Sequence, residues 1–194
     1  MAHLKFYYGV MGAGKTTELI KTYEIYRRKG MKPVVIKPSL DNREGDQNGW
    51  GTTSSRLTRD SVPAYYFKDI QEELPTLDYD ILLVDESQFL SNDEVIYLSE
   101  IADRKNIDVL AYGLKTDING NLFPGAASLL AIADETKELE YICDTPLCQE
   151  KATMHLRYVN GKIDLSGNSV AIEKGDVTYK SVCRKCWKKA QNDR

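Results

Sequence analysis

The stretch "YGVMGAGKTTEL", residues 8–19, joins a run of aromatic residues to a helical pattern and places three glycines at the junction. Gly9, Gly14, Lys15 and Thr16 have the spacing G-x-x-x-x-G-K-T of a phosphate-binding loop, which connects a strand to a helix. Glycine permits backbone conformations that are closed to residues with a Cβ, so successive N–H groups can turn toward a phosphate. The helix N-terminus adds a partial positive charge. The stretch therefore predicts an α/β domain that binds a nucleotide.

Within such a loop, Lys15 reaches the β- and γ-phosphates and the Thr16 hydroxyl ligates Mg²⁺. We disfavour the alternative, a glycine-rich turn without a ligand, because the flanking strand and helix patterns are both present. The residues of this motif that we predict to bind ATP are Gly9, Val10, Met11, Gly12, Ala13, Gly14, Lys15, Thr16 and Thr17.

The residues around the loop predict a β-α-β unit. Residues 4–8 and 34–37 are short β-branched or aromatic runs, and the helical pattern between them ends before Gly30. Residues 39–56 are polar and rich in glycine, and we interpret them as a long loop, which in compact domains is usually functional or mobile.

Two further apolar runs extend the same alternation. Residues 80–84 and 107–113 are nearly continuous apolar segments, as expected for parallel strands that are covered on both faces. The helix between them begins with Ser91 and Glu94, which have the spacing of a capping box. We therefore predict a P-loop α/β fold with a mainly parallel sheet and right-handed crossovers.

Two acidic residues follow the buried strand in "ILLVDESQF", residues 81–89. A phosphate loop requires a carboxylate near its metal at the end of a neighbouring strand, and Asp85 is the candidate. Glu86 projects beyond the strand end, where ligands bind in open parallel sheets, and is the candidate general base. We place Gln88 with the ATP-binding residues. The alternative is that both acids only cap a loop.

Four cysteines occur as two close pairs, Cys143 with Cys148 and Cys183 with Cys186. The first residues, "MAHLKFYYG", lack the apolar segment of a secretory signal, so we expect a cytoplasmic protein in which disulfides are disfavoured. Two thiolate pairs then fit a structural Zn²⁺ site without an open position. Free structural thiols are the alternative.

The pattern changes after about residue 140, where strand-like runs are joined by Asn160-Gly161, a strong hairpin signal. We predict an ATP-binding domain at 1–138 and a small zinc-binding, β-rich domain at 139–194.

Composition excludes several classes of function. The 194 residues are 42% hydrophobic and 28% charged with a net charge of -3, and no run approaches the roughly 18 apolar residues of a membrane span. This balance does not favour nucleic acid as a partner, since binding phosphates requires concentrated positive charge. We interpret the basic C-terminal residues as a solvated helix face. They are Arg184, Lys185, Lys188 and Lys189.

Taken together, the chain resembles the zinc-containing thymidine kinases of many bacteria, some viruses and the vertebrate cytosol. The resemblance covers nearly the whole chain and rests on six segments. They are "YYGVMGAGKTTEL", "DNR" at 41–43, "LLVDESQFL", "YGLKTDINGNLF", "KATMHLR" and "YKSVCRKC". It implies a P-loop domain with a zinc-bearing lasso domain, and transfer of the γ-phosphoryl group of ATP to the 5′-hydroxyl of thymidine, with deoxyuridine as a possible acceptor.

The resemblance also implies roles for individual residues. Glu86 would accept the proton, and Arg43 would lie near the phosphates. The residues that resemble those around the nucleoside are Met11, Phe89, Leu114, Phe123 and Tyr179, with main-chain contacts from Val170, Ala171, Ile172 and Glu173. A homotetramer and inhibition by thymidine triphosphate (dTTP) are further implications. The sequence departs from many bacterial relatives at Lys115, where they have arginine, and at Lys174 in the lasso.

Two other functions were weighed. An ATP hydrolase coupled to nucleic acid can carry the same Asp-Glu pair, but it generally needs a second ATPase lobe and a basic track that this chain lacks. A non-enzymatic zinc module is opposed by the intact Lys15, Thr16, Asp85 and Glu86. We interpret both histidines, His3 and His155, as structural.

Overall fold

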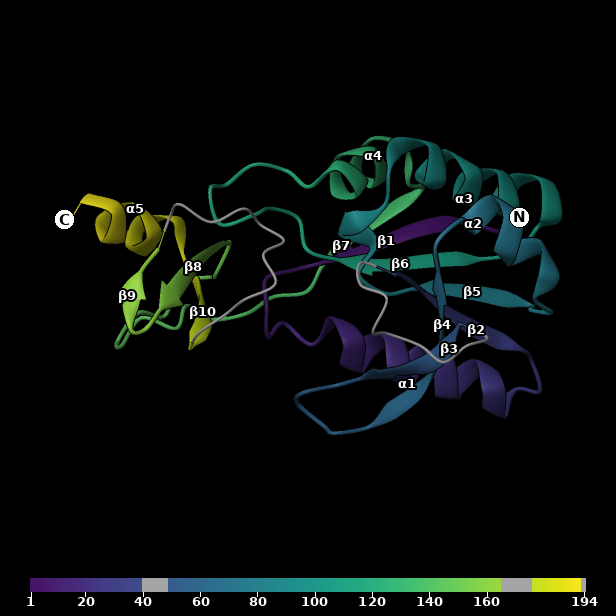
Figure 1. Ribbon diagram of the computed structural model, residues 1–194, viewed down its shortest axis with the longest axis horizontal. Coiled ribbons are helices and arrows are strands. Elements are labelled where there is room, and N and C mark those ends of the chain that lie inside the picture. Colours follow the sequence, from purple (N-terminus) through teal and green to yellow (C-terminus); the bar gives the residue numbers. More distant parts are fainter. Residues whose placement is uncertain (40–48, 165–175, 193–194) are drawn as a thin grey trace.

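The computed structural model describes residues 1–39, 49–164 and 176–192, which form a large α/β body and a smaller β-rich module (Figure 1). The two bodies lie at opposite ends of the long axis of the molecule, with the C-terminus on the small module. A domain boundary at residue 138 stays a prediction. Among the described residues, no helix has the length and apolarity needed to cross a membrane.

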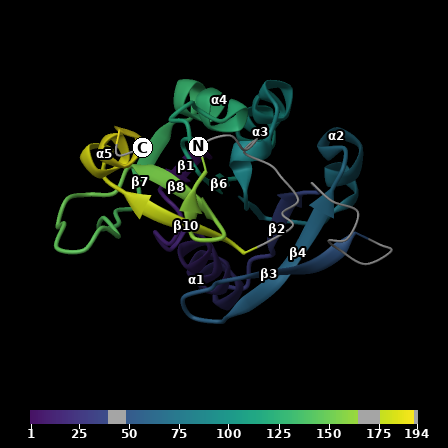
Figure 2. The same ribbon diagram turned by 60° about the vertical axis from the view of Figure 1, so that its left-hand side comes forward.

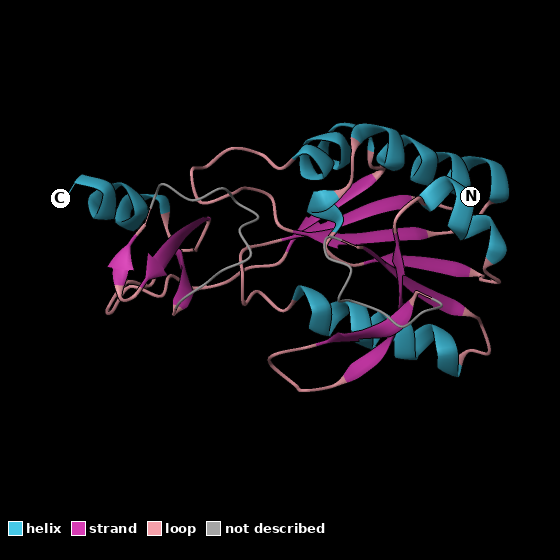
Figure 3. Cartoon of the chain, viewed as in Figure 1, coloured by secondary structure: helices cyan, strands magenta, loops and turns pink. Residues whose placement is uncertain are grey.

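The described part of the large body is built on a seven-stranded sheet with the order β3-β4-β2-β5-β6-β1-β7. Figure 3 shows these strands in magenta with helices on either side. Among the described strand pairs of this sheet, only β3–β4 is antiparallel. The predicted mainly parallel sheet is confirmed. The bounds of the strands are β1 Leu4–Tyr8, β2 Pro33–Pro38, β3 Trp50–Ser54, β4 Ser61–Phe67, β5 Ile81–Val84, β6 Val109–Gly113 and β7 Glu135–Glu138.

The central strands are apolar throughout because both faces of the sheet are covered. In β5, Leu82 and Val84 pack into one hydrophobic cluster, whereas Ile81 and Leu83 pack into another. This alternation follows from the two-residue period of a strand. The first cluster includes residues of α3 (Asn92–Lys105) and α4 (Pro124–Ile132), and the second includes residues of α1 (Lys15–Arg28).

The helices accordingly lie on opposite faces of the sheet (Figure 1). The predicted capping box at the start of α3 is confirmed: the Ser91 side chain accepts from the Glu94 amide, and the Glu94 carboxylate accepts from the Ser91 amide. α1 ends at Arg28, before the predicted stop at Gly30, which has a φ of +80°. Short helical segments complete the body at α2 (Ile70–Glu73), η1 (Leu74–Thr76) and η2 (Ser87–Phe89).

The interpretation of residues 39–56 as a loop is wrong in part, because residues 50–54 form the edge strand β3. β3 pairs with β4, and Val62, Ala64 and Tyr66 of β4 fill the same cluster as α1. Pairing across this hairpin overrides the polar composition of β3, one face of which is exposed. Residues 40–48 lie outside the described residues.

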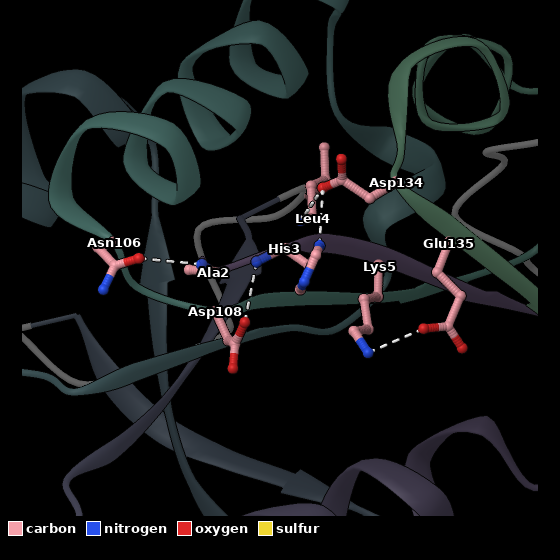
Figure 4. A network of polar contacts seen from close by, with 8 residues as sticks. All are labelled: Ala2, His3, Leu4, Lys5, Asn106, Asp108, Asp134 and Glu135. Carbon is pink, nitrogen blue, oxygen red and sulfur yellow. Dashed lines mark hydrogen bonds and ion pairs between the residues drawn. The ribbon is translucent and has the colours of Figure 1, made fainter.

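Hydrogen bonds and an ion pair hold the N-terminal end of β1, which is the end of the strand away from the phosphate loop (Figure 4). The amide of Ala2 donates to Asn106 Oδ1 at 3.0 Å, and the amide of His3 donates to Asp108 Oδ1 at 2.9 Å. On the other side of the strand, the Leu4 amide donates to Asp134 Oδ2 at 2.7 Å, and Lys5 pairs with Glu135. These contacts fix the strand that leads into the loop.

Within the described residues, the small module has a three-stranded antiparallel sheet with the order β10-β8-β9. β8 (Met154–Val159) and β9 (Lys162–Ile163) form the predicted hairpin, and Asn160 and Gly161 have φ values of +50° and +75°. β10 (Val177–Val182) leads into α5 (Arg184–Asn192), on which the four basic residues are exposed, as predicted. Figure 2, turned from the first view, shows β8 and β10 on the side of the large body where α1 begins.

Candidate active site

The phosphate loop between β1 and α1 has the conformation that its glycines predict. Gly12 and Gly14 have φ values of +81° and +80°, and Gly14 is the residue before the first turn of α1. The amides of this first turn have no acceptor within the helix and can bind an anion. Lys15 Nζ lies against the loop, where it donates to the carbonyl oxygens of Gly9 at 3.2 Å and Val10 at 2.8 Å.

A cavity of about 420 Å³ opens beside this loop. It brings together the predicted Lys15, Thr16, Asp85 and Glu86, which come from two different crossover units of the sheet. Its wall also contains residues from the β3 segment that sequence reasoning did not place there. These are Thr52, Thr53, Ser54, Ser55, Arg56 and Leu57.

The cavity lowers the pKa of Lys15 to about 8. Burial is the main cause, and the negative charges of Glu86 and Asp85 oppose it. An ammonium group that has lost hydration through burial is stabilised in its charged form by a nearby negative charge. An anionic ligand in the cavity would therefore stabilise the protonated form of Lys15.

Asp85 lies at the end of β5 and is 4% exposed. Burial, and then the Glu86 charge, raise the pKa of Asp85. A short hydrogen bond from the Thr53 hydroxyl and the positive charge of Lys37 act in the opposite direction. Sequence reasoning missed Thr53 and Lys37. The signal for Lys37 was its place at the end of a predicted strand, whereas nothing in the polar segment singled out Thr53.

Glu86 occupies the left-handed region, with a φ of +52° that is unusual for a residue other than glycine. Gln88 Nε2 donates to Glu86 Oε2 at 2.6 Å, and Gln88 Oε1 accepts from the Leu114 amide at 3.0 Å. Gln88 is 1% exposed. The structure therefore shows Gln88 fixing the Glu86 carboxylate through a hydrogen bond. The predicted contact of Gln88 with ATP stays a prediction.

Two glycines press against the turn that carries Glu86. A Cβ on Gly113 would lie 2.6 Å from Ser87 Oγ and 2.9 Å from the Gln88 amide nitrogen. A Cβ on Gly125 would lie 2.3 Å from the Ser87 carbonyl oxygen. Only glycine permits this approach, so the turn is locked between the end of β6 and the start of α4. Sequence reasoning assigned no role to either glycine.

The apolar residues predicted for the nucleoside site gather in one hydrophobic cluster. Leu114 and Phe123 are buried in it, and Met11 and Phe89 pack against it. The Phe89 and Phe123 rings meet edge to face at 5.7 Å. Met11 and Leu114 also line the cavity that holds Lys15 and Glu86.

The remaining predicted residues lie in the small module or outside the described residues. Tyr179 is on β10 of the small module and is 36% exposed. Arg43 and the segment Val170, Ala171, Ile172 and Glu173 lie outside the described residues, as does Lys174.

The four cysteines form one cluster in the small module. Their sulfur atoms all lie within 4.8 Å of one another, and Cys148 Sγ is 3.9 Å from the sulfurs of both Cys183 and Cys186. A tetrahedron with zinc–sulfur distances of about 2.3 Å has sulfur–sulfur edges of about 3.8 Å. The sulfurs also accept hydrogen bonds from the Cys183 and Cys186 amides. The cluster therefore fits a tetrahedral metal such as zinc, despite the wide spacing of the first pair.

A glycine loop before a helix, a lysine that lies against this loop and a strand-end aspartate define a P-loop nucleotide-binding protein. The comparison with protein families is more specific: the family described as "Thymidine kinase" matches residues 2–187. A thymidine kinase of Legionella pneumophila (strain Paris) is 41% identical over 200 residues, which cover 98% of this chain and 91% of the relative. A thymidine kinase of Streptococcus pyogenes serotype M1 is 40% identical over 189 residues, covering 95% and 96% of the two chains. The chain belongs to the thymidine kinase family.

Proposed function

We propose that the protein transfers the γ-phosphoryl group of ATP to the 5′-hydroxyl of thymidine, giving thymidine monophosphate and ADP. The family match over residues 2–187 supports the reaction. The observation that carries the assignment of roles is the single cavity that holds Lys15, Thr16, Asp85 and Glu86 together.

The loop and the first turn of α1 bind the phosphates, and Lys15 leaves the carbonyls of Gly9 and Val10 to pair with them. Thr16 and Asp85 are the residues that would hold Mg²⁺, which fits their hard oxygen atoms. When bound, Mg²⁺ offsets the charge on the phosphate oxygens. Arg43 is proposed to act near the phosphates, from outside the described residues.

Glu86 is proposed as the general base. As the 5′-oxygen of thymidine attacks the γ-phosphorus, Glu86 accepts the hydroxyl proton, and the bond to the β–γ bridging oxygen breaks to release ADP. The hydrogen bond from Gln88 supports this role, because it fixes the carboxylate at 2.6 Å without neutralising it. Positioning and electrostatic stabilisation supply the rest of the catalysis.

The nucleoside is proposed to bind against Met11, Phe89, Leu114 and Phe123, with Tyr179 packing on it and main-chain contacts from residues 170–173. Deoxyuridine is proposed as a further acceptor. The cysteine cluster is proposed to hold Zn²⁺ in a structural role. A homotetramer, a cytoplasmic location and inhibition by dTTP are proposed from the resemblance to the family.

Incubation with γ-labelled ATP, Mg²⁺ and a panel of nucleosides, followed by chromatography, tests the proposal. Labelled thymidine monophosphate is the expected product. Labelled free phosphate that depends on added nucleic acid would indicate the hydrolase instead, and no turnover would indicate a binding module.

A further inference from the structure

Both backbone polar groups of Met11, in the phosphate loop, are bound by side chains of the small module. The Met11 amide donates to His155 Nε2 at 3.0 Å, and the Ser181 hydroxyl donates to the Met11 carbonyl oxygen at 2.7 Å. His155 on β8 and Ser181 on β10 are direct register partners. Since opposite residues of an antiparallel pair share a face, two adjacent side chains of the small sheet hold one residue of the loop.

These contacts are shielded from water, because His155 and Ser181 are each 2% exposed. The imidazole also has a hydrogen bond with the main chain of Thr116, in the segment after β6. A ring that donates from one nitrogen to a carbonyl keeps the lone pair on the other, which explains why Nε2 accepts from Met11. His155 thus joins the small module to two segments that border the nucleotide cavity.

Ser181 is held in turn by the turn that carries the first cysteine pair. Its amide donates to Asp144 Oδ2 at 2.7 Å, and its carbonyl oxygen accepts from the Asp144 amide at 2.8 Å. Tyr141, just before this turn, packs against the loop, since a Cβ on Gly12 would lie 3.3 Å from the Tyr141 ring. The hydrogen bonds of Asp144 therefore fix Ser181 in the surface of the small module that contacts the phosphate loop.

We propose that His155 and Ser181 are positioning residues for phosphoryl transfer, which hold the phosphate loop in its binding conformation through Met11. The Ala13 amide is used within the loop, where it donates to the Val10 carbonyl oxygen at 3.2 Å. Contacts with the small module thus hold the loop in its binding conformation before ATP arrives. ATP binding then costs little further conformational entropy of the loop. Neither side chain touches the reacting atoms. The inference rests on the proposed function of the loop.

Direct binding of Mg²⁺·ADP, measured by calorimetry at about pH 8, tests the inference. The variants are His155→Phe, which keeps a ring without an acceptor, His155→Gln, which restores an acceptor oxygen, and Ser181→Ala. His3→Gln and Ser128→Ala are the matched controls, because their side chains contact Asp134 and Asn92 and not the phosphate loop. Loss of a buried hydrogen bond weakens an equilibrium roughly tenfold, so we expect about tenfold higher Kd values for His155→Phe and Ser181→Ala. His155→Gln and the controls should stay within about threefold of wild type.

The outcomes separate the two proposals. If the wild-type protein does not bind Mg²⁺·ADP, the proposed function fails and the inference fails with it. If the wild type binds and the His155→Phe and Ser181→Ala variants bind equally well, the inference is overturned while the proposed function stands. Weakening by His155→Gln but not by His155→Phe would show that the imidazole only fills space, and would overturn the role of its acceptor nitrogen. Ser181→Ala removes a single oxygen and keeps the test open if His155→Phe does not fold.

Discussion

Lowering the pH below about 6.5 should destabilise the protein through His155. Burial, followed by the positive charge of Lys15, lowers the pKa of this imidazole from 6.5 to about 4. Asp117 and the hydrogen bond with Thr116 act in the opposite direction, and Lys115 and Glu138 line the same small cavity as the ring. Between the two pKa values, the unfolded chain binds a proton that the folded protein does not bind. The free energy of unfolding therefore rises with pH across this window.

The magnitude follows from linkage. The stabilisation is complete above the unfolded pKa and is lost as the pH falls toward the folded pKa. The two values give a loss of about 1.3 kcal/mol between about pH 7.5 and 5.5, and a total of about 3 kcal/mol once the pH is below 4.

Urea unfolding of the wild type and His155→Gln at about pH 7.5, 6.5 and 5.5 measures this effect. Glutamine does not titrate, and the contributions of carboxylates and cysteines cancel in the difference between the two proteins. That difference should change by about 1.3 kcal/mol in the direction of a less stable wild type at the lowest pH. If the wild type and His155→Gln have parallel pH profiles, His155 is not buried in its neutral form and the reasoning is refuted.

Three further predictions concern the cysteine cluster, the Glu86 turn and the charge of the cavity. Chelation of the proposed Zn²⁺ should expose residues 143–186 to limited proteolysis while residues 1–138 stay resistant, and unchanged resistance after confirmed metal loss would count against a structural site. Gly113→Ala should lower the free energy of unfolding by about 2 kcal/mol in denaturant titrations, since its Cβ meets Ser87 at 2.6 Å; an unchanged midpoint would contradict the packing described. Lys37 lines the same cavity as Lys15, so Lys37→Met should raise the KM for ATP roughly tenfold, while the exposed Lys32→Met should not; equal KM values would show that Lys37 does not contribute to ATP binding.

The elements that the sequence predicts well are those with a local cause. The phosphate loop, the capping box at Ser91 and Glu94, and the Asn160-Gly161 turn each depend on residues a few positions apart. The continuous apolar pattern of β5 predicts burial on both faces, because each residue of such a strand is covered from one side or the other.

The features that sequence reasoning misses depend on contacts between distant segments. β3 is polar and is a strand only because β4 pairs with it, and Pro63 weakens the strand signal of β4 itself. Thr53 acquires its role from Asp85, 32 residues further along the chain. His155 meets Met11 across 144 residues. No spacing rule connects residues so far apart, so these partners become visible only in the folded structure.

The role of Glu86 is tested most directly by the initial rate at which labelled thymidine monophosphate forms from γ-labelled ATP and thymidine. Glu86→Gln keeps an oxygen that can accept from Gln88 but cannot take up the proton, and Glu100→Gln on the outer face of α3 is the matched control. The account predicts at least about a hundredfold lower rate for Glu86→Gln at saturating substrate, with Mg²⁺·ADP binding preserved. A rate within twofold of wild type would contradict it.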